Sequence, residues 1–140
     1  MSVFSNLRKS AGSVVLDGGL NLISRLGRLH PHARRVAKKV QVTRNIPYGD
    51  AGKKQLLDVY APKNAEGPLP VIVYVHGGGF RILSKETHWM MGSTFASRGF
   101  IVFNINYHLA PKHPYPTALQ DVGKAVQWVK ENAHTYGGDP

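Results

Sequence analysis

Two largely apolar runs stand out in the second half of the chain, at residues 71–75 and residues 101–106. Neither shows the strict alternation of apolar and polar positions that a half-exposed strand would have. Such runs are typical of strands that are buried on both faces of a parallel sheet. Because helical patterns separate and follow them, the sequence predicts an α/β fold with right-handed crossovers.

The two helices expected around these strands have recognisable ends. Ser84 is a plausible N-cap for the first helix, and Gly99 stands where a helix C-terminus favours a left-handed residue. The second helix should begin near Pro116 and end before Gly137. Its predicted core face is an apolar stripe made of Leu119, Val122, Val126 and Val129.

A hairpin is predicted ahead of the first of these strands. Residues 40–48 and residues 56–61 are strand-like, and the G-D-A-G sequence of residues 49–52 has the composition of a tight turn. The two strands of this hairpin should pair antiparallel. A loop over residues 62–68 then leads to the strand at residues 71–75.

The N-terminal part of the chain follows a helical period instead. From Val15 to Val40, apolar or small residues recur in alternating steps of four and three. Pro31 interrupts this stripe, because proline fits a first helical turn but not a helix interior. We therefore predict one helix that ends near Leu29 and a second helix over residues 31–39.

Charge separates a basic arm or cap, residues 1–40, from a nearly neutral body, residues 41–140. The formal net charge is +10, and residues 1–44 hold nine Lys or Arg and one acid, a net +8. Three interpretations remain open for the arm: a cap helix packed on its own domain, an amphipathic helix on an anionic membrane or over an apolar substrate entrance, and a nucleic-acid-binding segment. Nucleic acid is not expected, because the arm has no recognised DNA-binding motif and few aromatic residues.

Composition removes several classes of chemistry. The chain has no cysteine, which excludes disulfides, thiolate metal sites and a cysteine nucleophile. No apolar run approaches the roughly 20 residues of a membrane span, and Asp17 interrupts the only candidate signal-peptide core. The Arg-rich N-terminus would also suit a mitochondrial transit peptide. We expect a cytoplasmic location, with membrane association through the arm as the alternative.

Candidate chemistry lies directly after the strand at residues 71–75, where the sequence reads H-G-G-G-F over residues 76–80. The spacing fits neither the G-x-G-x-x-G of a dinucleotide site nor a P-loop, so phosphate binding is not expected. Consecutive glycines leave backbone N–H groups uncovered, as the oxyanion hole of an acyl-transfer enzyme requires. The alternative is a tight turn from strand to helix.

Three sequence blocks together resemble the hormone-sensitive-lipase-like branch of the α/β-hydrolase esterases. They are H-G-G-G-F at residues 76–80, N-Y-H-L-A-P-K-H-P-Y-P with T-A-L-Q-D-V at residues 106–122, and Y-G-G-D-P at residues 136–140. The resemblance covers residues 41–140 and keeps the blocks in the family's order. It implies a carboxylic ester hydrolase that acts on a short or medium acyl chain, without a cofactor.

The resemblance also implies roles for individual residues. The backbone N–H groups of Gly78 and Gly79 would donate to the oxyanion. His108 stands where the family has arginine and Lys112 where it has glutamate, which argues against a bidentate brace from residue 108, because imidazole lacks the planar fork of a guanidinium. Supporting roles fall on Gly77 and His76 in the loop, on Tyr107 and Pro111 in the turn after the second strand, and on Asp121 as a buried acid.

The rest of the family's machinery is not in this sequence. No G-x-S-x-G nucleophile elbow occurs, so the chain offers no nucleophile, acid or base. No metal site is expected, since the histidines have no recognised metal-ligand spacing. The residues considered for these roles and set aside are Ser84, Ser93, Ser97, His88, His113 and His134.

In the resembled family, Y-G-G-D-P leads toward a fifth strand that precedes the elbow. We therefore expect this chain to be the N-terminal part of a longer esterase, with an incomplete α/β-hydrolase fold and no activity by itself. Its strand at residues 71–75 would then have one unpaired edge, through which the chain is expected to self-associate. The rival hypotheses are a non-catalytic binding or regulatory protein on the same scaffold and a small basic protein whose function lies in the arm.

Overall fold

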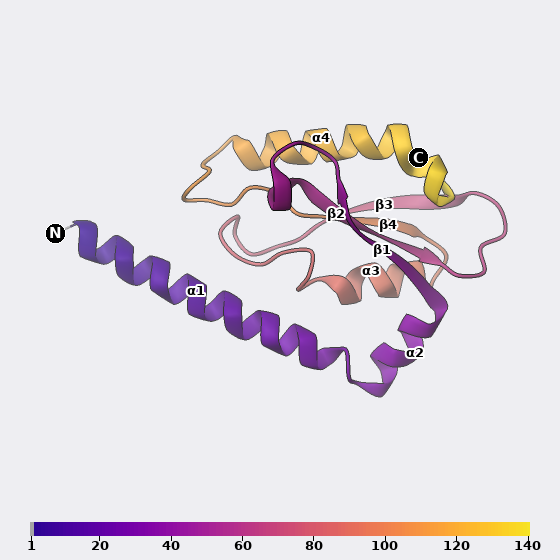
Figure 1. Ribbon diagram of the computed structural model, residues 1–140, viewed down its shortest axis with the longest axis horizontal. Helices are drawn as coiled ribbons and strands as arrows, with labels where there is room; N and C mark the ends of the chain where they lie inside the picture. Colours follow the sequence, from indigo (N-terminus) through magenta and orange to yellow (C-terminus); the bar gives the residue numbers. More distant parts are fainter. Residues whose placement is uncertain (1) are drawn as a thin grey trace.

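A computed structural model describes the backbone of residues 2–140 and the side chains of residue 12 and residues 15–140. It contains one five-stranded sheet with helices on both faces (Figure 1). The helices are α1 (Ser2–Gly27), α2 (Pro31–Lys39), α3 (Trp89–Ala96) and α4 (Thr117–Asn132), with short 3-10 helices at Gly52–Gln55 and Ala133–Tyr136. The strands are β1 (Val40–Pro47), β2 (Leu56–Pro62), β3 (Leu69–Val75), β4 (Ile101–Ile105) and β5 (Gly138–Asp139).

The sheet has the strand order β1-β2-β4-β3-β5. The predicted hairpin is confirmed, because β1 and β2 pair antiparallel with Val42 opposite Tyr60. The predicted parallel pair is confirmed as well, with Val73 of β3 opposite Phe103 of β4. Strand β2 pairs antiparallel with β4, so the sheet is mixed. These observations confirm the predicted α/β class.

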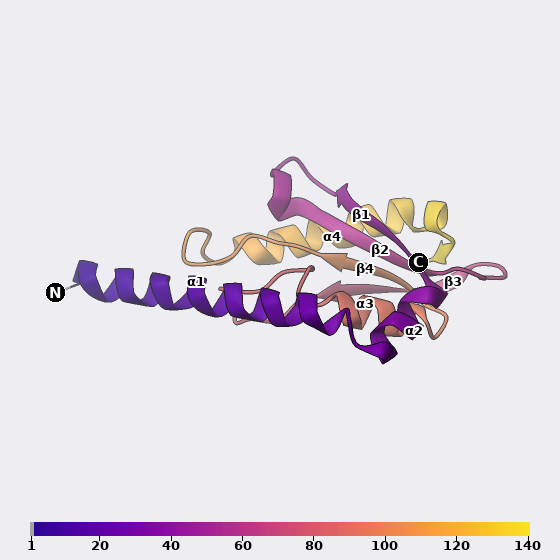
Figure 2. The ribbon, with the colours of Figure 1, turned by 60° about the horizontal axis from the view of Figure 1, so that its bottom comes forward.

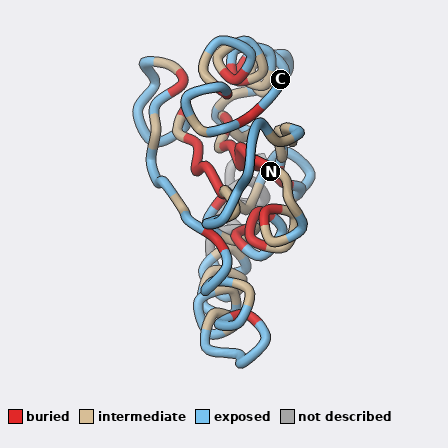
Figure 3. The backbone as a smooth tube through the Cα atoms, turned by 90° about the vertical axis from the view of Figure 1, so that its right-hand side faces the viewer, coloured by how far each residue is buried: buried red, intermediate tan, exposed pale blue. Residues whose placement is uncertain are grey.

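Two apolar cores lie on opposite faces of this sheet. Helix α4 covers one face, and α2 and α3 lie on the other (Figure 1). All five residues of β4 are buried, as the largely apolar run at this position predicts, and Figure 3 shows the buried residues gathered in the strands and the helix turns nearest them. The α4 core contains Leu57, Ile101, Phe103, Ile105, Ala125 and Val129, and the other contains Ala33, Val40, Tyr60, Trp89, Ala96 and Val102.

On one side, strand β3 pairs with β4 through residues 71–75. On its other side, β5 pairs with Leu69 and Pro70. Among the described residues no strand pairs with residues 71–75 along that edge, and Val75 is 39% exposed. An apolar edge without charge or proline is a template for intermolecular strand pairing. The expected self-association through this edge stays a prediction.

Helix ends and faces differ from expectation at several points. Helix α3 begins at Trp89, not near Ser84, and no side chain caps its N-terminus. Leu119 of α4 is 63% exposed, so its assignment to the core was wrong. The left-handed residue predicted at Gly99 is confirmed, with φ of +96°, and α4 ends before Gly137 as expected.

The N-terminal helices lie along one side of the body. The predicted second helix is confirmed as α2, and α1 is longer than the apolar period indicates (Figure 1). The His30 side chain accepts a hydrogen bond from the backbone of His32 at the start of α2. None of the helices in the described part of the chain is long and apolar enough to cross a membrane.

Candidate active site

The candidate site begins where β3 ends, at His76. Its side chain is buried, and its Nδ1 donates to the carbonyl oxygen of Gly77 at 2.8 Å. The Tyr107 hydroxyl, from the segment after β4, donates to the His76 carbonyl oxygen at 2.7 Å. The two rings stack with centroids 4.4 Å apart. These contacts tie the ends of two parallel strands together at the start of the glycine loop, and the supporting role expected of His76 stays a prediction.

The three glycines that follow have unequal steric demands. Gly78 has φ of +116°, and a Cβ there would lie 2.1 Å from the carbonyl oxygen of Ile82. Gly79 has φ of +60° with open space around a Cβ, and Gly77 has open space and no positive φ. Gly78 is therefore the position at which the fold of the loop itself requires glycine.

The amides of Gly78 and Gly79 have no acceptor within the described residues. The Gly78 carbonyl, in contrast, accepts from the backbone N–H groups of Arg81 and Ile82 at 3.1 and 3.2 Å, which closes a tight turn. Both amides can therefore donate to an oxygen that enters from outside the loop. The glycine loop can therefore be a tight turn and an anion-binding loop at the same time.

Two larger residues in the same loop also have left-handed backbone angles. Phe80 has φ of +59° and Leu83 has φ of +75°, which is uncommon for residues with bulky side chains. Contacts from elsewhere hold both: the Phe80 carbonyl accepts from the Ala110 backbone at 2.8 Å, and the Leu83 backbone donates to the Asp17 carboxylate of α1 at 3.0 Å. Backbone strain of this kind concentrates at functional sites.

The segment after β4 is braced by Asp121 of α4. One of its carboxylate oxygens accepts both the backbone N–H and the Nδ1–H of His108, at 2.8 and 2.6 Å, and the other accepts from Gln55 at 2.7 Å. Burial alone would raise the pKa of Asp121, but these hydrogen bonds and His108 hold it below its usual value. The brace therefore exists with imidazole in place of guanidinium, through a single carboxylate oxygen and without the bidentate fork.

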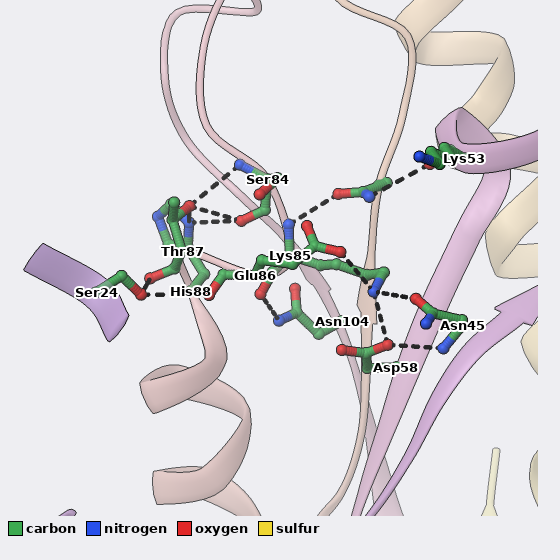
Figure 4. A network of polar contacts seen from close by, with 11 residues as sticks. Ser24, Asn45, Lys53, Asp58, Ser84, Lys85, Glu86, Thr87, His88 and Asn104 are labelled. Carbon is green, nitrogen blue, oxygen red and sulfur yellow. Dashed lines mark hydrogen bonds and ion pairs between the residues drawn. The ribbon is translucent and has the colours of Figure 1, made fainter. Parts of the chain in front are cut away.

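A buried ion pair that the sequence did not reveal anchors the second half of the loop (Figure 4). The Lys85 ammonium lies 2.7 Å from the Asp58 carboxylate and 2.9 Å from the Asn45 side chain, and Lys85 and Asp58 are each 1% exposed. The Lys85 backbone also bonds to the side chains of Asn104 and Asn106, at 2.9 and 2.8 Å. The loop is thus fixed to β1, β2 and β4 from its far end.

The remaining candidate side chains do not form a catalytic group. Ser93 is buried within α3, and the Ser97 hydroxyl donates to the Thr94 carbonyl. His88 lies 5.7 Å from His76 between ring centroids, and no acid bonds to it among the described residues. No group of three or more potential metal-ligating residues occurs in the described part of the chain.

Lowering the pH is expected to weaken the fold through His76. Burial, followed by the nearby His88, lowers its pKa below the ordinary 6.5, so the folded state favours the neutral ring. The contribution of neutral His76 to the free energy of unfolding is complete above about pH 6.5, and it is lost as the pH falls toward the lower pKa of the folded state. The urea midpoint should fall between about pH 7 and pH 5, and less steeply in His76→Asn. The exposed His134→Asn serves as control, and an unchanged slope in His76→Asn would contradict this assignment.

Comparison with known proteins gives matches along most of the chain. The family model described as BD-FAE matches residues 57–140. Esterase LipQ of Mycobacterium tuberculosis (strain ATCC 25618 / H37Rv) is 38% identical over 113 residues, which are 79% of this chain and 26% of LipQ. The chain thus spans about a quarter of that relative's length.

Two solved structures share the fold. Esterase B from Lactobacillus rhamnosis, in a structure with a tributyrin phosphonate, has a TM-score of 0.85 at 20% identity. The match includes 99% of this chain and 44% of the esterase B chain. Brefeldin A esterase, a bacterial homologue of human hormone-sensitive lipase, has a TM-score of 0.59 at 31% identity, over 71% of this chain and 29% of its own.

Proposed function

Because this chain belongs to the BD-FAE family, within the α/β-hydrolase esterases, we propose that it provides the oxyanion-binding loop of a carboxylic ester hydrolase. The observation that carries the proposal is the pair of amides at Gly78 and Gly79, which have no acceptor in the described part of the chain, on a loop that is fixed at both ends. The substrate class is an ester of a short or medium acyl chain, and no cofactor takes part.

In the proposed reaction, a serine hydroxyl attacks the ester carbonyl carbon while a histidine takes the hydroxyl proton, and the π electrons of the C=O bond move onto the carbonyl oxygen. The amides of Gly78 and Gly79 donate to that oxyanion, which lowers the barrier by about 3–4 kcal/mol for each donor. The C=O bond then re-forms as the C–O bond to the alcohol breaks, and the alcohol leaves with the proton that the histidine took from the serine. Water attacks the acyl-enzyme in the same way and releases the acid.

The serine and the histidine of this reaction are proposed to come from polypeptide other than these 140 residues, which contain no G-x-S-x-G elbow. The 140-residue chain alone is therefore expected to be inactive. Purified chain should hydrolyse p-nitrophenyl butyrate no faster than its Gly78→Ala variant. Turnover that a serine-directed phosphonate abolishes would contradict this expectation.

A chimaera tests whether the loop is functional. The 113-residue segment of LipQ that matches this chain is replaced by the corresponding residues of this chain. The chimaera should hydrolyse p-nitrophenyl butyrate, because the two segments are 38% identical over 113 residues. A chimaera that unfolds cooperatively but shows no turnover would instead favour the second candidate, a non-catalytic binding protein on the same scaffold.

A further inference from the structure

Helix α1 contacts the body through polar groups. The Asp17 carboxylate accepts from the Leu83 backbone at 3.0 Å, and the Ser24 carbonyl accepts from the Trp89 indole at 3.0 Å. The Ser24 hydroxyl donates to the carbonyl oxygens of Glu86 and Thr87 at 3.2 and 3.3 Å. Positions 17 and 24 are seven residues apart, two helical turns, so they lie on one face of α1. This face is the one turned toward the body.

The opposite face of α1 is apolar, and nothing in the described part of the chain covers it. At about 100° per residue, positions 15, 16, 22, 23 and 26 fall within one sector of the helix, on the side away from Asp17 and Ser24. An amphipathic helix on a globular protein normally buries such a sector against the core. We call these five side chains the outer stripe: Val15 is 77% exposed, Leu16 53%, Leu22 59%, Ile23 66% and Leu26 56%.

Basic residues lie next to the outer stripe, near the end of α1 that leads to α2. Residues 1–44 carry a net +8, and their one acid, Asp17, is turned toward the body, where it bonds to Leu83. Figure 2 shows α1 running across the front of the molecule with α2 beside its end. Four basic side chains of α2 are exposed: Arg34, Arg35, Lys38 and Lys39. An apolar sector with cations beside it matches the interface of a membrane that contains anionic lipids.

We propose that the outer stripe inserts into the interface of an anionic lipid bilayer, with α1 parallel to the membrane plane and the cations of α1 and α2 on lipid phosphates. A second copy of this chain is a poorer occupant, because pairing two stripes would bring together two N-terminal segments, residues 1–44, each of net +8. Since Asp17 ties α1 to Leu83, the glycine loop would lie about one helix diameter, 10–12 Å, from the bilayer. The proposal does not depend on the esterase activity.

Sedimentation of the full chain with lipid vesicles tests it. The chain should bind vesicles that contain phosphatidylglycerol and should bind neutral phosphatidylcholine vesicles at least about tenfold more weakly. Binding should weaken as salt rises from about 0.05 to 0.5 M, because the ions screen the charges. Absent binding, or equal binding to both kinds of vesicle, would overturn the proposal.

Matched variants locate the contact. Leu22→Asp with Leu26→Asp should lower phosphatidylglycerol partitioning at least about tenfold, because the variant loses the burial of two leucines. Leu119→Asp changes a leucine that is similarly exposed, at 63% on α4, and should stay within about twofold. Equal binding by both variants, with unchanged thermal transitions, would contradict the role of the stripe.

Charge variants give a readout that does not depend on the stripe substitutions. Arg34→Gln with Arg35→Gln should weaken phosphatidylglycerol binding and reduce its salt dependence, while Lys124→Gln with Lys130→Gln on α4 should change neither. Light scattering tests whether a second copy of the chain covers the stripe instead. If the chain does not bind vesicles but forms a dimer, and if Leu22→Asp with Leu26→Asp dissociates this dimer, the proposal is overturned in favour of self-association.

Discussion

Replacing Lys85 with methionine is expected to lower the free energy of unfolding by about 3–5 kcal/mol, because it leaves the buried Asp58 carboxylate without its cation. Asp58 is 1% exposed, and one of its oxygens has no hydrogen-bond partner among the described residues. A loss of this size is a large part of the roughly 5–15 kcal/mol that stabilises a typical domain. Urea unfolding followed by circular dichroism measures it.

Two further variants separate the ion pair from packing. Adding Asp58→Asn to Lys85→Met should recover part of the loss, because the double variant buries no unpaired charge and the introduced amide oxygen can still accept from the Asn45 backbone. Lys124→Met on the exposed side of α4 should change stability by no more than about 0.5 kcal/mol. Additive losses in the double variant would show that Lys85 acts through its packing and not through its charge.

Sequence patterns predicted the positions of the strands well, because strands depend on local information, but the predicted burial of residues 71–75 on both faces was wrong, since none of these residues is buried. The apolar run at residues 101–106 corresponds to β4, whose five residues are all buried, and the G-D-A-G turn joins the antiparallel pair that was expected. Leu119 was assigned wrongly because its spacing matches the core face of α4, although it lies in the first turn of that helix. Periodicity identifies a face but not how much of it the sheet covers.

The start of α3 was misplaced because long-range contacts outweigh local capping preferences. Ser84 and Thr87 bond to each other in a turn, and Lys85 is held by residues of β1, β2 and β4. Its partners Asp58 and Asn45 lie 27 and 40 residues away in the sequence. A lysine in an unremarkable loop gives no local sign of such an ion pair.

The outer stripe is another case in which local sequence patterns could not predict long-range contacts. The period of three and four residues correctly indicated that Leu22 and Leu26 share a face of α1, but it could not say whether that face meets the body. The polar contacts of Asp17 and Ser24 decide the direction, and they depend on the backbone of residues 83–87. In contrast, His76 and the glycines could be singled out from the sequence because they are contiguous in the chain, and their role in an active site stays a prediction.

Gly78→Ala in the LipQ chimaera is expected to lower kcat about 10²–10³-fold, with a much smaller change in KM, since misplacing one oxyanion donor has an effect of this size. The alanine Cβ would lie 2.1 Å from the Ile82 carbonyl oxygen, so the backbone of the turn must move. This movement displaces the amides of Gly78 and Gly79 together. Steady-state hydrolysis of p-nitrophenyl butyrate gives both constants.

Alanine substitutions at the neighbouring glycines are expected to lower kcat by smaller amounts, which tests the prediction within the same loop. Gly79→Ala has open space but φ of +60°, so it should lose less activity, in line with the roughly 1–2 kcal/mol that left-handed geometry costs alanine. Gly77→Ala has neither a clash nor a positive φ and should stay close to the unmodified chimaera. Only the Gly78 substitution forces the turn to move. If kcat is unchanged in Gly78→Ala, or if Gly77→Ala lowers kcat as much as Gly78→Ala does, the amides of the loop do not act on the transition state.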